Sequence, residues 1–212
     1  MLSETVKRKG HHVTLYDIKP KFQNLLRPTV DRLHARGIRA NQVTLLAMLL
    51  SVLLGGILIS FPVPVLFISL PIFLFFRMAL NAMDGMLARE FNQQSRLGAI
   101  LNEVGDLIAD AVLYLTFAFV AGVELWLVVL VVLLSWLTEF CGVVAQTLTG
   151  IRHYQGPLGK SDRAFVLGAV GLFIALWPQY IGIINIIFIL LILLLVWTCI
   201  NRCRCALETE NV

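Results

Sequence analysis

The chain has 212 residues, of which 58% are hydrophobic and 14% are charged. Because about a quarter of the residues in an average soluble domain are charged, this composition excludes that class and predicts an integral membrane protein. The net charge of +4 is small and suits anionic lipid headgroups, so we expect no nucleic acid partner.

Residues 1–39 are predicted to form a cytoplasmic segment with an amphipathic juxtamembrane helix. Apolar residues recur there at helical spacing among Lys and Arg, at Leu15, Ile18, Phe22, Leu25, Leu26 and Leu33. This pattern is typical of an interfacial helix that lies on the inner leaflet. A helix packed as a cap on the rest of the protein would show the same pattern, because amphipathicity does not identify what covers the apolar face.

Residues 40–201 contain six apolar stretches, each long enough to cross a hydrocarbon layer of about 30 Å. They are residues 40–60, 63–89, 98–121, 123–149, 163–180 and 181–200. We therefore predict an all-α fold of six transmembrane helices, followed by a short cytoplasmic tail at 202–212. All 17 Lys and Arg except Arg77 lie in the terminal segments or near the connections on one side. The positive-inside rule then puts both termini in the cytoplasm.

Polar side chains interrupt the second and third stretches at helical spacing. One face of the second stretch carries Arg77, Asn81, Asp84, Ala88 and, slightly to one side, Gly85. One face of the third carries Gly98, Asn102, Asp106 and Asp110. Ionisable groups are rare at membrane depth because desolvation is costly, so these two ladders indicate a functional site.

If the two ladders face each other, carboxylate and amide oxygens converge, with no His or Cys among them. Such donors suit a hard cation, Mg²⁺ or Mn²⁺, better than zinc. The small residues at 85, 88 and 98 would let a ligand approach the backbone closely. The structural alternative is that Asn and Gly only hold transmembrane helices together. That alternative does not account for three aligned aspartates, because buried carboxylates need partners.

The motif from Asn81 to Asp106 resembles the signature of the CDP-alcohol phosphotransferases (CDP-alcohol phosphatidyltransferases), integral membrane enzymes of phospholipid headgroup synthesis. That signature has the form D-x-x-D-G-x-x-A-R-x8-G-x-x-x-D-x-x-x-D, and the chain matches its spacing. The segment Ala40-Asn41-Gln42-Val43-Thr44 is similar to the P-N-x-L-T run before the first span of that family. The resemblance covers nearly the whole chain, including the six-span layout.

The resemblance implies that divalent cations bind the diphosphate of a CDP-linked donor while an acceptor hydroxyl attacks its β-phosphorus and displaces CMP. By position, the implied metal ligands are Asn81, Asp84, Asn102 and Asp106. Asp106 is also the implied catalytic base. The implied CDP-binding residues are Thr44, Gly85, Ala88, Arg89 and Gly98.

The chain departs from the family pattern at Asn81 and Asn102, which stand where the family has Asp. An amide oxygen can bind Mg²⁺ but carries no charge, so two motif carboxylates remain where the family has four. We therefore expect weaker metal binding, with as few as one metal site occupied. Asp110, one turn beyond Asp106, could supply a missing charge or could instead pair helices.

The connection between the fourth and fifth spans carries the cations Arg152, Lys160 and Arg163 around a loop that contains Gly and Pro. Cations beside the free N–H groups of a helix start suit an anion. In the resembled family, a basic cluster here often receives the phosphate of a phosphorylated polyol acceptor. Positive-inside topology explains the same charges without an acceptor.

Two further charged residues lie at membrane depth. Arg77 could pair with Glu103, with Glu139 or with a carboxylate of the site. Glu139 could pair with Arg77 or line the acceptor pocket, since intramembrane acids nearly always face protein or water.

The leading hypothesis is a divalent-metal-dependent phosphotransferase of the bacterial inner membrane. It would move a phosphatidyl or related phosphoryl-alcohol group from CDP-diacylglycerol to a hydroxyl acceptor. The second hypothesis is a lipid-nucleotide binding protein, inactive because of the two asparagines. The third is an ion or proton transporter. It predicts ion or proton flux in liposomes and no binding of CDP. A homodimer is implied by the resemblance alone.

Overall fold

The computed structural model describes residues 15–208, and every regular element in this range is helical. The α-helices are α1 (Leu15–Ala35), α2 (Ala40–Ser60), α3 (Ser69–Glu90), α4 (Arg96–Leu115), α5 (Leu125–Thr149), α6 (Lys160–Leu176) and α7 (Gly182–Glu208). Three short 3₁₀ helices join them, η1 (Pro64–Ile68), η2 (Thr116–Phe119) and η3 (Pro178–Tyr180). Residues 1–14 and 209–212 of the predicted terminal segments lie outside the described residues.

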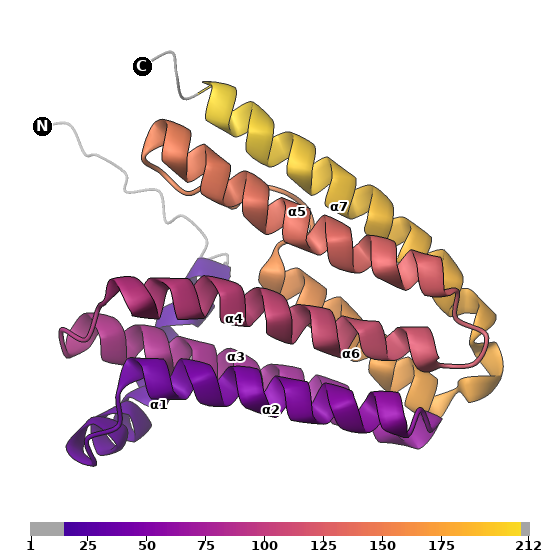
Figure 1. Cartoon of the computed structure of the whole chain (residues 1–212), viewed down its shortest axis with the longest axis horizontal. Helices are drawn as coiled ribbons and strands as arrows, with labels where there is room; N and C mark the ends of the chain where they lie inside the picture. Colours follow the sequence, from indigo (N-terminus) through magenta and orange to yellow (C-terminus); the bar gives the residue numbers. More distant parts are fainter. Residues whose placement is uncertain (1–14, 209–212) are drawn as a thin grey trace, which may run out of the picture.

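The helices α2 to α7 form one bundle (Figure 1). Helix α2 packs against both α3 and α4, α5 lies along α7, and α6 packs against α3 and η1. Consecutive helices run in opposite directions, so the α3–α4 and α5–α6 connections lie at the end of the bundle beside α1. We call this the α1 end; it is on the left in Figure 1.

Each of the six predicted stretches overlaps one α-helix, and four of the helical segments are long and apolar enough to cross a membrane. These four are Ala40–Ser60, Pro64–Glu90, Leu125–Thr149 and Gly182–Glu208. Helix α4 falls short because Glu103, Asp106 and Asp110 lie along it, and α6 because it has only 17 residues. The protein is therefore membrane-embedded, and the full set of six spans stays a prediction.

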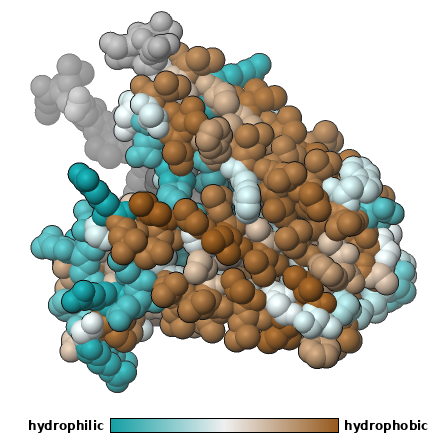
Figure 2. Space-filling model, viewed as in Figure 1, coloured by the Kyte–Doolittle hydropathy of each residue, from teal (hydrophilic) through white to brown (hydrophobic). Residues whose placement is uncertain are grey.

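The outer surface of the bundle matches a lipid environment. Figure 2 shows a broad hydrophobic surface over the helices, with hydrophilic side chains gathered at the α1 end. Large apolar side chains on the outside are extensively exposed, as at Ile72 (68%), Phe140 (63%) and Leu193 (61%). In water such a surface would be unfavourable, because burial of apolar area is a main driving force of folding.

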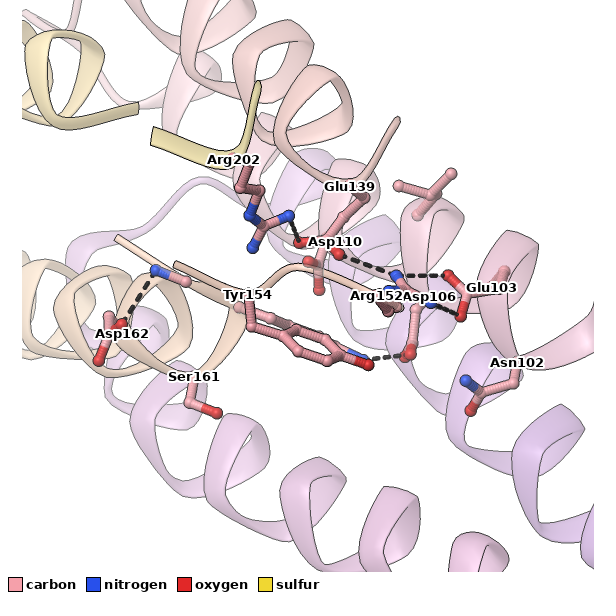
Figure 3. Close-up of a pocket in the computed structure, with 13 residues that line it drawn as sticks. Asn102, Glu103, Asp106, Asp110, Glu139, Arg152, Tyr154, Ser161, Asp162 and Arg202 are labelled. Carbon is pink, nitrogen blue, oxygen red and sulfur yellow. Dashed lines mark hydrogen bonds and ion pairs between the residues drawn. The ribbon is translucent and has the colours of Figure 1, made fainter. Parts of the chain in front are cut away.

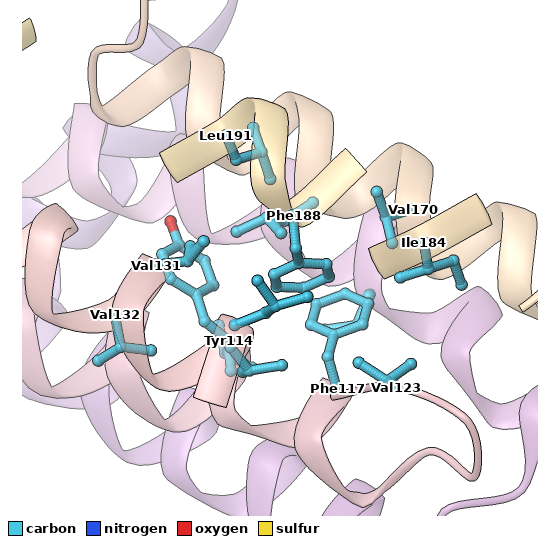
Figure 4. Packing of buried hydrophobic residues seen from close by; sticks show 14 of the residues in the cluster. Tyr114, Phe117, Val123, Val131, Val132, Val170, Ile184, Phe188 and Leu191 are labelled. Carbon is cyan, nitrogen blue, oxygen red and sulfur yellow. The ribbon is translucent and has the colours of Figure 1, made fainter. Parts of the chain in front are cut away.

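The largest buried apolar cluster lies toward the end of the bundle opposite α1. Figure 4 shows Tyr114, Phe117 and Phe188 among aliphatic side chains of α5, α6 and α7. The rings of Phe117 and Phe188 meet edge to face with centroids 5.7 Å apart. This cluster joins the helices firmly at one end, which leaves the α1 end for the polar residues.

Helix α1 forms where the amphipathic pattern predicts it and packs against α3. Phe22 contacts Phe75 with ring centroids 6.0 Å apart, and Arg27 donates to Glu90 at 2.9 Å. Val30 is fully buried. Part of the apolar face of α1 is thus covered by protein, while contact of α1 with the lipid interface remains a prediction.

The C-terminal boundary differs from the predicted one. Helix α7 continues to Glu208, so residues 202–208, expected in a tail, extend the last helix. Arg202 is buried within this extension, with 1% of its surface exposed.

Candidate functional site

The two polar ladders do face each other, on α3 and α4. Asn81 of α3 donates its side-chain N–H to the Oδ1 atom of Asp106 at 2.9 Å. Asp84, one turn further along α3, is close enough to Asp106 for the two carboxylates to interact electrostatically. The two ladders therefore meet at Asn81 and Asp106, while the binding of a cation there stays a prediction.

A pocket of about 680 Å³ opens between α2, α3 and α4, and we call it the α2–α4 pocket. Its wall includes eight of the residues expected to bind CDP or metal, Thr44, Asn81, Asp84, Gly85, Ala88, Arg89, Gly98 and Asn102. Thr44 donates its hydroxyl to Oδ2 of Asp84 at 2.7 Å and also to the Ala40 carbonyl. Thr44 thus orients the Asp84 carboxylate, which is 5% exposed.

Two glycines of the motif are explained by close approach. A Cβ atom at Gly98 would lie 2.6 Å from Oδ1 of Asn41 and 3.0 Å from the Ser95 hydroxyl, so a larger residue would force the Asn41 side chain to move. A Cβ atom at Gly85 would lie 3.1 Å from a guanidinium nitrogen of Arg89. The Arg89 side chain therefore lies back over Gly85, along the wall of the α2–α4 pocket.

Asp106 is surrounded by donors. Lys160, at the start of α6, donates to its Oδ2 atom, and Arg77 donates to Oδ1 at 3.0 Å and to the Asp106 carbonyl at 3.2 Å. With the hydrogen bond from Asn81, both carboxylate oxygens are engaged. One acid on α4 thereby joins α3, α4 and α6.

Asp110 is completely enclosed in ion pairs. Arg77 donates to it at 2.5 Å, and a guanidinium nitrogen of Arg163 lies 3.6 Å from its other oxygen. Arg77 therefore pairs with carboxylates of the site, the third of its predicted partners, and not with Glu103 or Glu139. Asp110 therefore joins α4 to α3 and α6 through its ion pairs, and its role as a metal ligand stays a prediction.

A second pocket, of about 370 Å³, lies between α4, α5, the α5–α6 connection, the start of α6 and α7, and we call it the α4–α7 pocket. Figure 3 shows the charged side chains that line it. Arg152 donates to both oxygens of Glu103 and, at 3.2 Å, to Glu139. The hydrogen bond to Glu103 raises the pKa of Arg152 above its ordinary value, so this guanidinium stays charged.

The sequence leaves two interpretations of Glu139 open, a pair with Arg77 or a place in the wall of the acceptor pocket. In the structure Glu139 lines the α4–α7 pocket and does not pair with Arg77. Besides Arg152, it accepts from Arg163 at 3.0 Å and lies 3.6 Å from Arg202. Arg163 also donates to the Thr138 hydroxyl and is 1% exposed. The structure thus places Arg163 behind the pocket wall, not at the predicted acceptor site, because three polar partners hold it there.

The predicted metal donors lie together, but only two are carboxylates. Within the range 15–208, no three His, Cys, Asp or Glu side chains group closely enough to hold a metal ion. Asp84 and Asp106 with the amides Asn81 and Asn102 fit one hard divalent cation by chemistry. A cation bound to Asp106 would compete with the donors that already contact it, Arg77, Asn81 and Lys160.

Some residues of the two pockets were not expected from the sequence. Tyr154 and Arg202 line the α4–α7 pocket, and the Tyr154 ring lies 5.4 Å from the guanidinium carbon of Arg152. Asn41 and Gln93 line the α2–α4 pocket, and Gln93 accepts from the Ala40 N–H. No periodicity marks these positions; they become neighbours only when the helices pack.

Comparison with known proteins relates the chain to one family. Residues 38–199 match the family model described as CDP-alcohol phosphatidyltransferase. The chain is 54% identical over 195 residues to the inner membrane protein YnbA of Escherichia coli strain K12. That match covers 92% of this chain and 97% of YnbA.

Solved structures of the phosphatidylinositol phosphate synthase of Mycobacterium tuberculosis share the fold. The structure with CDP-DAG bound has a TM-score of 0.69 at 21% identity, covering 84% of this chain and 92% of that one. The structure in complex with manganese and citrate also has a TM-score of 0.69 at 21% identity, with coverages of 86% and 87%.

Proposed function

The chain belongs to the CDP-alcohol phosphatidyltransferase family, and we propose that it is an active phosphotransferase of this kind. It transfers a phosphatidyl or related phosphoryl-alcohol group from a CDP-activated donor, CDP-diacylglycerol, to a hydroxyl acceptor and releases CMP. The protein of known structure with CDP-DAG bound supports this choice of donor. Family membership favours this function over ion or proton transport.

The observation that carries the proposal is that the two pockets meet at the motif. Asn102 lines both the α2–α4 pocket and the α4–α7 pocket. Asp106 lines the second pocket and accepts a hydrogen bond from Asn81, which lines the first. A donor in one pocket and an acceptor in the other would therefore place their reacting atoms beside Asp106.

The α2–α4 pocket is assigned to the nucleotide and diphosphate. Arg89 and Arg96 supply positive charge to its wall, and Gly85 leaves room for the Arg89 guanidinium to lie against α3. Ser95 caps α4 by accepting from the Gly98 N–H, so the helix start that faces this pocket is fixed in place.

Asp106 is assigned as the catalytic base. An acceptor hydroxyl in the α4–α7 pocket gives its proton to an Asp106 carboxylate oxygen while its own oxygen bonds to the β-phosphorus. The bond from that phosphorus to the CMP oxygen breaks, and CMP leaves. Lys160 donates a hydrogen bond to Asp106. It holds the carboxylate in position and adds positive charge near the reacting phosphate.

Asp84 and Asp106, with the amide oxygens of Asn81 and Asn102, are assigned as ligands of Mg²⁺ or Mn²⁺. The bound ion would neutralise charge on the diphosphate as the β-phosphorus is attacked. The manganese complex of the structurally similar synthase supports a divalent ion. The orientation, with both termini in the cytoplasm of a bacterial inner membrane, belongs to the same proposal.

The test is CMP release by the purified protein from CDP-diacylglycerol with Mg²⁺ or Mn²⁺ and a panel of alcohols. We expect acceptor-dependent CMP release, and a loss of at least about 100-fold in Asp106→Asn, since general base catalysis contributes about that much or more. The control is Glu90→Gln, which changes an acid of α3 that pairs with Arg27 outside both pockets. If Asp106→Asn retains the wild-type rate, Asp106 is not the base.

A second candidate, a lipid-nucleotide binding protein without activity, is favoured by the engagement of Asp106 with Lys160 and by the two amides. It predicts that CDP-diacylglycerol raises the thermal stability of the wild type while no alcohol elicits CMP. The double substitution Asn81→Asp and Asn102→Asp would then create activity. CMP release by the wild type rules this candidate out.

A further inference from the structure

The five cations in and behind the wall of the α4–α7 pocket are all paired with acids of the same chain. Arg152 is held by Glu103 and Glu139, and Lys160 by Asp106. Of the remaining three, Arg77 pairs with Asp106 and Asp110, Arg163 with Asp110 and Glu139, and Arg202 with Glu139.

Acids outnumber cations among the residues that line the pocket. Five acidic residues line it: Glu103, Asp106, Asp110, Glu139 and Asp162. Asp162 accepts from the Gly159 N–H at the start of α6. Three cations, Arg152, Lys160 and Arg202, line the same pocket, so its lining carries no net positive charge, although the sequence there is rich in Lys and Arg.

A phosphate group on the acceptor would be unfavourable in such a pocket. To bind Arg152 or Lys160 it would have to displace a carboxylate and leave that acid unpaired in a partly buried site, which is costly. This phosphate would also bring further negative charge close to the donor diphosphate. Neutral hydrogen-bonding groups of Asn102, Tyr154 and Ser161 instead line the same space.

Resting on the proposed function, we propose that the acceptor is an unphosphorylated polyol, and that Glu103 enforces this choice. Glu103 has a half-exposed side chain, 40% accessible, and lies at the rim of the pocket. By binding Arg152, Glu103 makes the most accessible guanidinium of this pocket unavailable to an incoming anion. Glu103 therefore acts as a specificity-determining residue, and Arg152 is the cation that it occupies.

The test compares wild type with Glu103→Gln, which keeps the shape of the side chain and removes one negative charge beside Arg152. Glu90→Gln is the matched control, because it removes an acid of the same type outside the pocket. Two measurements are made, CMP release from CDP-diacylglycerol with glycerol or myo-inositol against their monophosphates, and the thermal shift produced by inorganic phosphate.

For the wild type, we expect CMP release with the unphosphorylated polyols at least about tenfold faster than with their phosphates, because the site offers no free charge. Phosphate should produce no Arg152-dependent thermal shift. In Glu103→Gln, reaction with the phosphorylated acceptor and the affinity for inorganic phosphate should each rise about tenfold. The further substitution Arg152→Gln should remove that gain.

The proposal is overturned if the wild type prefers a phosphorylated acceptor, or if it binds phosphate in a manner that Arg152→Gln abolishes. It is also overturned if Glu103→Gln gains nothing over Glu90→Gln. Failure of the proposed function looks different, because no acceptor would then elicit CMP and CDP-diacylglycerol would give no thermal shift. Even in that case, the thermal shift with inorganic phosphate tests whether Glu103 keeps Arg152 from binding an anion.

Discussion

Individual residues decide the charge balance of this site. Asn81 donates to the Asp106 carboxylate at 2.9 Å, a contact that an aspartate at position 81 could not make. Two carboxylates at that separation would repel each other unless a cation lay between them. The amide thus lets the α3–α4 pair stay closed with less positive charge in the site.

Substitution of both amides, Asn81→Asp with Asn102→Asp, is expected to make the protein more dependent on a divalent ion. We expect the affinity for Mn²⁺ to rise about tenfold or more, because charged ligands replace neutral ones. The midpoint of thermal unfolding should fall in a chelator and recover when Mn²⁺ is added. Isothermal titration and thermal unfolding in detergent measure the two effects.

The control for this prediction is Asn92→Asp, the same chemical change in the α3–α4 connection. Asn92 has a positive φ of 52°, which Asp also tolerates, and it lies outside the α2–α4 pocket. An equal gain in Mn²⁺ affinity in this control would mean that added charge alone, and not ligation at the ladders, is responsible.

At the scale of the elements, α4 has the central place. Its residue Asn102 lines both pockets, and its acids line the α4–α7 pocket, so the position of α4 relative to α2 determines how the two pockets meet. Close approach of α2 and α4 is possible because Gly55 lies directly against the backbone of Val112. Small residues at such contacts are common in transmembrane helix pairs.

Gly55→Ala is expected to destabilise the protein by about 1–3 kcal/mol, because the added methyl group would overpack the interface. Its Cβ atom would lie 3.1 Å from the Val112 carbonyl oxygen and even closer to the Val112 side chain. The neighbouring Gly56 has nothing within 4 Å of a Cβ atom, so Gly56→Ala is the matched control. We expect no loss of stability there, since Ala favours a helix over Gly.

Thermal unfolding in detergent measures both glycine variants. Equal unfolding midpoints for Gly55→Ala and Gly56→Ala would show that α2 and α4 do not approach as closely as the structure has them. CMP release is a second readout, because displacement of α4 should also disturb the alignment of the two pockets.

At the scale of the whole molecule, charge and topology agree. The connections at the α1 end carry Lys and Arg, and the connections at the opposite end, near residues 61–63, 120–124 and 177–181, carry none. The polar pockets also lie toward the α1 end, away from the aromatic cluster of Phe117 and Phe188. A cytoplasmic α1 end would therefore give a nucleotide donor direct access to the site.

The orientation can be measured by cysteine labelling in a variant whose four native cysteines are replaced by serine. Gln179→Cys lies at the opposite end and Glu208→Cys at the α1 end, and both positions are exposed. With both termini in the cytoplasm, a membrane-impermeant maleimide should label residue 179 in spheroplasts and residue 208 only after permeabilisation. The reverse pattern would contradict the proposed orientation.

The sequence alone determined the helices and much of the chemistry. Long apolar runs predict α2, α3, α5 and α7, because the lipid core demands a minimum length of apolar helix. Spacing of three and four residues placed Asp84 with Asn81, and Asp106 with Asn102, since one helix determines its own faces. The family signature rests on these same local spacings.

Only the tertiary structure decided which charges meet. Arg163, expected at the acceptor site, is buried behind it, while Arg202, expected in a tail, lines the pocket and donates to the Thr138 carbonyl, 64 residues away. Helical periodicity gives the direction of a side chain around its own axis. It does not give the rotation or depth of one helix against another, which close contacts such as Gly55 with Val112 set.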